Sequence, residues 1–425
     1  MEQPDAVAAP AVPQPRRGFW GWWTAIPLYL RILGALALGL VTGIALGDAA
    51  APLGIPARLV LRLLGAIAPP LILLAILRAF ITAELPQGTA PRLIRLLLLN
   101  TLVAIIIGMI VANVLRPGSW HPVTVTPPEA AAKAQPSPLD LFLDSSVPKS
   151  LLGPLGDSGN VLSVILIAIG FGVALRWLRD HPVRTARDLV EVGFQAMIGV
   201  LRWIIDIIPF GIFGIIANIV GTKGFAAFVP LGGFVVAVLV ALALQACWYL
   251  LRIRFGSWVS PLRVLRGTRD ALFTAFSTAS STATMPLTYA CLKDRVGLRE
   301  RSASVGALVG ANFNNDGTAL YEAMAALFVA QLLGMDLSLY QQLLVVLTSI
   351  AASVGAAGIP EAGLVTMTLV FRAVGLPIEY IAILLTVDWF LDRCRTTINV
   401  MGDINVSSLL DGKTPQEQVR QAASG

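Results

Sequence analysis

The sequence predicts an all-α membrane protein with eight transmembrane helices and two re-entrant helical hairpins. Three observations predict this fold class. The chain of 425 residues is 56% hydrophobic and only 13% charged, whereas about a quarter of the residues in an ordinary soluble protein are charged. Long apolar segments recur along the chain, and two later apolar segments are interrupted by small polar residues and proline. A chain with so little charge has lipid, rather than water, as the natural solvent for most of its surface.

The first part of the chain contains six segments that are long enough to cross a bilayer. A hydrocarbon core of about 30 Å needs roughly twenty apolar residues in a helix. The segments of this kind are 22–47, 59–81, 93–115, 160–178, 194–220 and 226–251. A polar, proline-rich segment, 117–159, separates the third from the fourth, and we expect it to lie outside the hydrocarbon. We expect a disordered cytoplasmic tail over 1–21 and a second cytoplasmic tail over 413–425.

Basic residues lie mainly in the breaks between apolar segments. Arginines follow the fourth and sixth segments and recur with a lysine at 293–301, whereas 334–342 contains no basic residue. Because cytoplasmic loops carry an excess of Lys and Arg, we predict a multi-pass protein of the cell membrane with both termini in the cytoplasm. This pattern accounts for the net charge of +6 without nucleic acid, which would need basic residues clustered on one folded face. The three cysteines are isolated, and no cofactor is expected.

Two interrupted apolar segments predict the hairpins. Small residues and a proline, 277–286, divide the segment near 260–297, and a similar stretch, 352–360, divides the segment near 337–377. Each half is too short to cross alone, and the basic flanks of only the first hairpin place the two bases on opposite faces. Two such units, each followed by a polar-containing apolar helix, predict an inverted repeat with broken helices near the midplane. Ordinary helices kinked by glycine and proline are the alternative.

The last long helix carries an unusual polar stripe. At about 100° per residue, its polar positions fall within less than about 90° of one face, and they are Asp388, Asp392, Arg395, Asn399 and Asp403. Charges are costly in lipid, so this face must line a cavity or meet protein partners. Three carboxylates face one guanidinium, and we expect bound cations to neutralise the excess. A closed network of ion pairs is the alternative. Arg393 projects elsewhere.

Arg395 is the residue that we expect to recognise an anionic substrate. Its planar guanidinium matches a carboxylate with two parallel hydrogen bonds. The other interpretation is that Arg395 neutralises Asp388 or Asp392 when the site is empty. The two roles are compatible, because a substrate carboxylate could compete for the same guanidinium.

A second polar cluster lies at 310–318. Adjacent asparagines and an Asp–Gly pair make a poor regular helix, so we predict local unwinding that frees carbonyl oxygens. Carbonyls together with Asp316 are hard ligands that suit alkali cations; a kinked helix capped by its own asparagines is the alternative. In the first hairpin tip, Ser280 and Ser281 offer hydroxyls and helix-end amides to an anion. The glycines of 355–363 would let the second hairpin move as a gate.

At these residues the chain resembles the glutamate/aspartate transporter family, also called dicarboxylate/amino acid:cation symporters. The resemblance is carried by DWFLDRCRTTINVMGD at 388–403 and DGTALYEA at 316–323. It implies a homotrimer in which 22–81 and 116–220 supply scaffold helices and the extracellular loop. The third helix within 82–115 and the hairpins and helices of 221–412 would form a transport domain that moves like an elevator.

The resemblance also implies the residues of the substrate site. Arg395 would hold the side-chain carboxylate of the substrate, and Asp392 its amino group. The other implied substrate-binding residues are Thr318, Thr396, Asn399, Ser280, Ser281, Ile359 and Gly363.

Three cation sites follow from the resemblance as well, with Na⁺ as the expected co-transported ion. The first combines Asp403 with carbonyls of Gly310, Asn314 and Asn399. The second uses carbonyls of Asn312, Ser353, Val354 and Ala356. The third uses Asp316, Asn314, Asn100 and Thr101. Glu322 stands where proton-coupled members carry a glutamate, which implies a role as proton carrier.

The chain departs from the family pattern at several of these positions. Asn315 replaces a methionine that links substrate and cation binding, and Leu97 stands where many members have a tyrosine. Glu361 adds a charge beside the second hairpin tip. Ala279 and Arg393 together suggest that an arginine found on the first hairpin in some members has moved to the last helix.

The predicted function is therefore secondary symport of aspartate or glutamate with Na⁺, H⁺ or both, and the protein is not expected to be an enzyme. Symport of neutral amino acids or of C4-dicarboxylates on the same fold is the alternative, although a neutral substrate would leave Arg395 unpaired. An intramembrane aspartyl protease using Asp316 and Asp403 fits poorly beside an arginine and many cation-type ligands. A pure anion channel leaves the acidic stripe unexplained.

Overall fold

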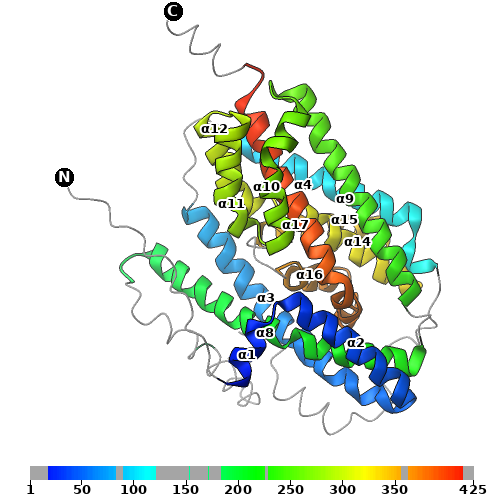
Figure 1. Cartoon of the computed structure of the whole chain (residues 1–425). Coiled ribbons are helices and arrows are strands. Elements are labelled where there is room, and N and C mark those ends of the chain that lie inside the picture. Colours follow the sequence, from blue (N-terminus) through cyan, green and yellow to red (C-terminus); the bar gives the residue numbers. More distant parts are fainter. Residues whose placement is uncertain are drawn as a thin grey trace, which may run out of the picture.

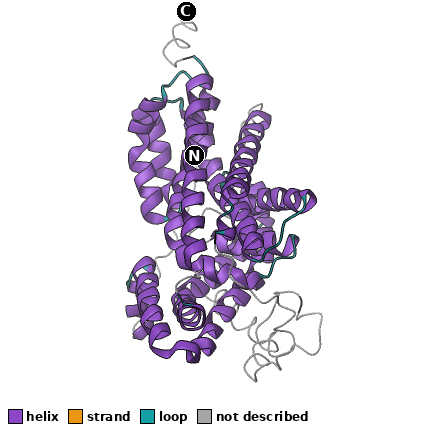
Figure 2. Ribbon diagram, turned by 90° about the vertical axis from the view of Figure 1, so that its right-hand side faces the viewer, coloured by secondary structure: helices purple, strands orange, loops and turns teal. Residues whose placement is uncertain are grey.

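The computed structural model describes residues 18–82, 90–120, 153, 171, 183–224, 228–355 and 362–414. Every regular element in these ranges is helical (Figures 1 and 2). Most of the predicted fourth span, 160–178, lies outside the described residues, as do 121–152 and the tip of the second hairpin, 356–361.

The helices of the N-terminal part of the chain pack along the long helix α8 (Ala186–Lys223). These helices are α2 (Leu28–Leu46), a 3-10 helix (Gly47–Gly54) and α3 (Ile55–Thr82), and the short helix α1 (Phe19–Ala25) precedes them. The prediction of a disordered tail over 1–21 is wrong at its end, because α1 begins at Phe19. The aromatic side chains of α1 stabilise it there, and Trp23 stacks on Phe210 of α8 with ring centroids 5.0 Å apart.

Particular residues explain where α8 begins and why it packs closely against α2. Thr185 and Asp188 form a capping box at the start of α8, since each side chain accepts a hydrogen bond from the backbone amide of the other. Glycine allows a close approach: a Cβ on Gly39 would lie 2.7 Å from the carbonyl oxygen of Phe213 on α8. Arg31 forms an ion pair with Asp206 at 3.1 Å.

Four stretches of the described residues are long and apolar enough to cross a membrane. They are Leu30–Ile67, Pro91–Ser119, Ala186–Thr222 and Val229–Gly256. The last three correspond to α4 (Ala90–Leu115) with its short extension, to α8 and to α9 (Val229–Gly256). Large apolar side chains point away from the protein on these helices, including Leu38 and Val114, which are 64% and 73% exposed. Such outward apolar faces are suited to lipid, as in a multi-pass membrane protein.

The first predicted hairpin consists of two short helices joined by a tight turn. They are α10 (Pro261–Thr278) and α11 (Ser281–Ala290), followed by a π-helical turn, Cys291–Val296. Ala279 ends α10 in the left-handed conformation, with φ of 51°. The hydroxyl oxygen of Ser280 then caps α11 by accepting a hydrogen bond from the amide of Ala283 at 3.1 Å. In the serine-rich tip, the C-cap of α10 is thus followed directly by the N-cap of α11.

The remaining helices surround the polar centre of the molecule. They are α12 (Glu300–Ser304), a π-helical turn (Val305–Val309), α13 (Gly310–Phe313), α14 (Asp316–Leu332), α15 (Leu339–Gly355), α16 (Ala362–Ala373), a 3-10 turn (Ile378–Tyr380) and α17 (Ile381–Asp411). The helix is broken at Asn314 and Asn315, whose ψ angles are 60° and 51°. The predicted local unwinding of the asparagine cluster is confirmed. Residues of α14 are buried almost throughout, between α4, α9, α15 and α17.

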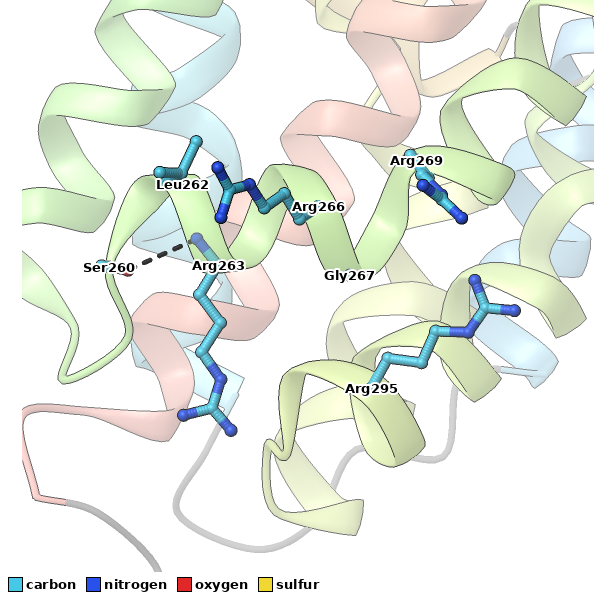
Figure 3. Close-up of a pocket in the computed structure, with 7 residues that line it drawn as sticks. All are labelled: Ser260, Leu262, Arg263, Arg266, Gly267, Arg269 and Arg295. Atoms are coloured by element: carbon cyan, nitrogen blue, oxygen red, sulfur yellow. Dashed lines mark hydrogen bonds between the residues drawn. The ribbon is translucent and has the colours of Figure 1, made fainter.

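A basic hollow of about 550 Å³ lies where α10 meets the π-helical turn after α11 (Figure 3). Its lining residues are Ser260, Leu262, Arg263, Arg266, Gly267, Arg269 and Arg295. Asp270 pairs with Arg295 and lies 3.5 Å from Arg269. This concentration of arginine lies at the base of the first hairpin, as the sequence predicts.

Candidate functional site

The polar stripe of α17 faces the interior of the protein. Asp388, Asp392, Arg395, Asn399 and Asp403 are all at most 6% exposed. Their partners include other residues of α17, the asparagines at the break before α14, and α14 itself, so the charged groups are removed from lipid as the sequence requires.

Arg395 is fully buried and holds two carboxylates. Its Nη2 donates to Oδ1 of Asp392 at 2.8 Å, and its Nη1 lies 2.9 Å from Oδ1 of Asp388. The guanidinium also lies over the ring of Tyr321, 4.0 Å from the centroid, as in a cation–π contact. The predicted neutralising role of Arg395 is therefore present in this conformation.

The pairing leaves hydrogen-bonding capacity unused. Among the described residues, Nε of Arg395 has no hydrogen-bond acceptor, and neither oxygen of Asp388 has a hydrogen-bond donor of good geometry. Buried polar atoms of this kind are uncommon in proteins and need an explanation. A further carboxylate arriving at the guanidinium would give Nε of Arg395 an acceptor.

Several predicted substrate residues surround this guanidinium. A Cβ on Gly363 of α16 would lie 3.3 Å from Nη1 of Arg395 and 3.3 Å from Cγ2 of Thr318. The amide nitrogen of Asn399 donates to Oγ1 of Thr318 at 3.3 Å. Its oxygen accepts from the backbone amide of Gly317 at 2.8 Å. Arg395, Thr318, Asn399 and Gly363 therefore form one cluster.

The remaining predicted substrate residues are Thr396 of α17, Ser280 and Ser281 of the first hairpin, and Ile359. Thr396 is buried on α17, next to Arg395 in the chain. The hydroxyl of Ser281 donates to the carbonyl of Ala311 at 3.0 Å, which ties the first hairpin tip to α13. Ser280 serves as the cap of α11. Ile359 lies outside the described residues.

The predicted first cation site has its members in contact. Nδ2 of Asn314 lies 3.3 Å from Oδ1 of Asp403 and 3.4 Å from the carbonyl oxygen of Asn399. Gly310 packs directly on Asp403, because a Cβ there would lie 2.4 Å from Oδ1. The buried Oδ1 of Asn314 has no partner within the described part of the chain, and no ion pair there involves Asp403. The Nδ2 donor of Asn314 thus contacts both a buried carboxylate without an ion pair and a backbone carbonyl, where the sequence predicts a cation.

The predicted second cation site is only partly described. The carbonyl of Ser353 accepts a hydrogen bond from Nδ2 of Asn315 at 2.9 Å. The side chain of Asn312 donates to the carbonyl of Leu308 at 3.2 Å. Val354 lies in the last turn of α15, and Ala356 lies outside the described residues. Asn315 therefore links the broken helix to the second hairpin.

The third predicted cation site contains two residues that sequence reasoning missed. Both oxygens of Asp316 accept hydrogen bonds, from Thr101 at 2.7 Å and from the hydroxyl of Tyr249 at 2.5 Å. A guanidinium nitrogen of Arg252 donates to Oδ1 of Asn100. Tyr249 and Arg252 lie three positions apart near the end of α9, and this spacing on an otherwise apolar helix was the available signal.

Glu322 is buried on α14. One carboxylate oxygen accepts a hydrogen bond from the hydroxyl of Thr366 on α16, and the other has no partner among the described side chains. Glu322 therefore joins the helix of the broken segment to the second hairpin.

Arg393 joins α17 to the first hairpin, off the polar stripe as predicted. Its Nη1 donates to the carbonyl oxygens of Phe276 and Ser277, at 2.9 and 2.5 Å. These carbonyls end α10, where a positive charge is favourable.

Comparison with known proteins gives consistent relatives. The chain is 39% identical to excitatory amino acid transporter 4 of Mus musculus over 267 residues, which cover 62% of this chain and 47% of that protein. It is 38% identical to excitatory amino acid transporter 3 of Oryctolagus cuniculus over 269 residues, covering 63% and 51%. For excitatory amino acid transporter 1 of Mus musculus, the identity is 39% over 256 residues, covering 57% and 45%. The matches thus span about half the length of these relatives.

The family comparison covers nearly the whole chain. The model of the Sodium:dicarboxylate symporter family matches residues 28–413, from the start of α2 to just beyond α17. The matched region includes the broken helix, both hairpins and the polar stripe. Members of this family are cation-coupled transporters of dicarboxylates or amino acids, not enzymes. The chain therefore belongs to the Sodium:dicarboxylate symporter family.

Proposed function

We propose that this protein is a secondary active symporter that carries aspartate or glutamate across the membrane with Na⁺, H⁺ or both. The observation that supports this most directly is the buried guanidinium of Arg395, whose Nη1 faces Gly363 and whose Nε has no acceptor among the described residues. A carboxylate of the substrate would occupy that edge and compete with Asp388 for Nη1. The related excitatory amino acid transporters, by their names, carry substrates of this class.

The rest of an amino acid also finds partners of the right kind. Asp392, released in part from Arg395, would receive the ammonium group in a charge-assisted hydrogen bond. Thr318 and Asn399 offer a hydroxyl and an amide beside it. The first hairpin tip, with Ser280 and Ser281, would hold the second carboxylate at the N-terminus of α11.

Cation coupling is supported by the carboxylate of Asp403. It is 2% exposed, and among the described residues it has one amide donor, at 3.3 Å; an isolated buried carboxylate is costly. A co-transported cation held by Asp403, Asn314 and the carbonyls of Gly310 and Asn399 would neutralise it. Asn399 also contacts Thr318, so ion and substrate would share one residue. Binding of one would then stabilise the arrangement required by the other.

We further propose that the hairpins with α14 and α17 move as a transport domain against α2, α3 and α8, in a homotrimer. The close glycine-mediated packing of α2 on α8 suits a static scaffold. The basic hollow at the base of the first hairpin supports a cytoplasmic location for that base, and hence for both termini. Glu322, between α14 and α16, is placed to carry a proton if protons are coupled.

The test is uptake of labelled aspartate into proteoliposomes with sodium and proton gradients imposed separately. We expect accumulation that needs at least one gradient and that unlabelled glutamate inhibits. Unlabelled succinate and serine distinguish the alternatives, a C4-dicarboxylate and a neutral amino acid symporter. Inhibition by serine alone, or uptake without dependence on either gradient, would refute the proposal.

A further inference from the structure

A fixed positive charge borders the third predicted cation site, because Arg252 donates to Asn100. We propose that the guanidinium of Arg252 takes the place of one co-transported cation there, so that this protein moves one cation fewer per substrate than three cation sites would provide. The inference rests on the proposed cation-coupled transport. It uses α4, α9, α14 and α17, which contact one another and are labelled near the centre of Figure 1.

The first reason is that Arg252 has taken a predicted cation ligand. Its Nη1 donates to Oδ1 of Asn100, the side-chain oxygen that would otherwise face a cation. The same amide is fixed at its other end, where Nδ2 of Asn100 approaches Oδ1 of Asn405 at 3.5 Å. The carbonyl oxygen of Asn100 in turn accepts from Nε2 of Gln245 at 3.4 Å. Both ends of the Asn100 amide and its backbone carbonyl thus already have partners in the protein.

The second reason is that Asp316 has a donor on each oxygen. Thr101 donates to Oδ1 and Tyr249 to Oδ2. Tyr249 and Arg252 come from the same face of α9, and the positive charge of Arg252 acts electrostatically on Asp316. One carboxylate and one guanidinium leave this part of the site without net charge.

A sodium ion fits this arrangement poorly. It needs several oxygens with free lone pairs and an excess of negative charge, but here the amide oxygen faces a guanidinium. The ion would also be repelled by the like charge of the half-buried Arg252. The first cation site differs in both its free oxygens and its charge. Within the described ranges, Oδ1 of Asn314 has no partner, and Asp403 has no ion pair to compensate its negative charge.

A built-in charge has a consequence for energy coupling. An arginine in the polypeptide remains in place through every step, so it draws no energy from the ion gradient. The substrate concentration ratio that the transporter can maintain depends on the sodium concentration ratio raised to the number of coupled sodium ions, and this exponent would be lower by one. Arg252 would thereby set the number of coupled ions, through the chemistry of the site rather than through its shape.

The test compares Arg252→Gln, which removes the charge, with Arg252→Lys, which keeps it. Arg254→Gln is the matched control, since Arg254 is an exposed arginine two positions beyond Arg252, in the last turn of α9. The first readout needs no transport: the melting temperature of the purified protein is followed against sodium concentration. Its slope reports the number of ions bound by the folded state. The second readout is the sodium gradient at which net aspartate flux reverses in proteoliposomes.

We expect Arg252→Gln to bind and transport one more sodium ion per protomer than the wild type, whereas Arg252→Lys and Arg254→Gln keep the wild-type number. Equal slopes for Arg252→Gln and the wild type would overturn the inference, as would a complete lack of stabilisation by sodium. If Arg252→Gln fails to fold, labelled sodium bound at saturation by the wild type with aspartate decides. Two ions per protomer support the inference, and three overturn it. A slope that rises in Arg252→Gln without any aspartate flux would reject the proposed function alone.

Discussion

Replacing Arg395 with lysine separates the shape of the guanidinium from its charge. Arginine reaches Asp392 at 2.8 Å and Asp388 at 2.9 Å with two different nitrogens and keeps Nε for a further acceptor. Lysine retains one positive charge on a single nitrogen and has no planar fork. Arg395→Lys should therefore leave much of the local charge balance intact while removing the bidentate contact with a substrate carboxylate.

The magnitude follows from the lost contact. One hydrogen bond between a buried charged donor and a carboxylate contributes about 1.5–3 kcal/mol, which corresponds to roughly a 10- to 150-fold change in affinity. We expect the aspartate concentration for half-maximal uptake to rise by about that factor. Arg395→Ala should abolish uptake and also lower stability by about 3–5 kcal/mol, because it leaves a buried carboxylate without its partner.

The assay is initial uptake of labelled aspartate in proteoliposomes across a range of substrate concentrations. Arg393→Lys is the control, since Arg393 lies outside the polar stripe and binds carbonyls of α10. Thermal unfolding in detergent shows whether each variant is folded, and the oligomeric state is followed in parallel. An Arg395→Lys protein with the wild-type half-saturation concentration would refute the assigned role of the guanidinium.

Three further predictions concern the same polar centre. Asp403→Asn should weaken the first cation site and shift the dependence of uptake on cation concentration upward; an unchanged curve removes that site from the scheme. Gly363→Ala should reduce aspartate affinity, because the added methyl would lie 3.3 Å from the guanidinium of Arg395. A raised half-saturation concentration for uptake, in a variant with normal thermal stability, would demonstrate this effect. Tyr249→Phe should lower stability by about 1–3 kcal/mol, since buried Asp316 loses a donor; thermal or denaturant unfolding measures this, and a variant as stable as the wild type contradicts it.

The sequence was most informative where chemistry conflicts with a lipid environment. Charges spaced along 388–403 had to share one buried face, and they do. The adjacent asparagines at 314 and 315 predicted a helix break, because such side chains compete with the helical backbone. The break lies at these two residues. Both predictions need only helical periodicity and the cost of burying polar groups.

Contacts between distant helices were harder to predict. Tyr249 and Arg252 stand at the end of an apolar span, where an arginine serves equally well as a topology signal. Only the packing of α9 against α4 and α14 reveals that they reach Asn100 and Asp316. The pairing of Arg395 with both Asp388 and Asp392 was likewise left open, because periodicity gives a shared face but not the rotamers on it.

The start of the first helix illustrates a different limit. The tail was expected to extend to residue 21, but aromatic residues from Phe19 onward begin a helix that stacks on α8. The contact that holds the start of this helix involves a partner almost two hundred residues away. Local composition contains no information on such a partner.

The glycine at position 310 has a consequence for ion selection. With only 2.4 Å between a Cβ at this position and Oδ1 of Asp403, main chain and carboxylate meet with no intervening side chain whose rotation could enlarge the space. An ion lodged there would be surrounded by atoms whose spacing the two helices dictate. At this proposed site, discrimination between sodium and the larger potassium would then depend on how firmly the main chain of Gly310 and the side chain of Asp403 are held, and a methyl group added at Gly310 should weaken it by displacing the carboxylate.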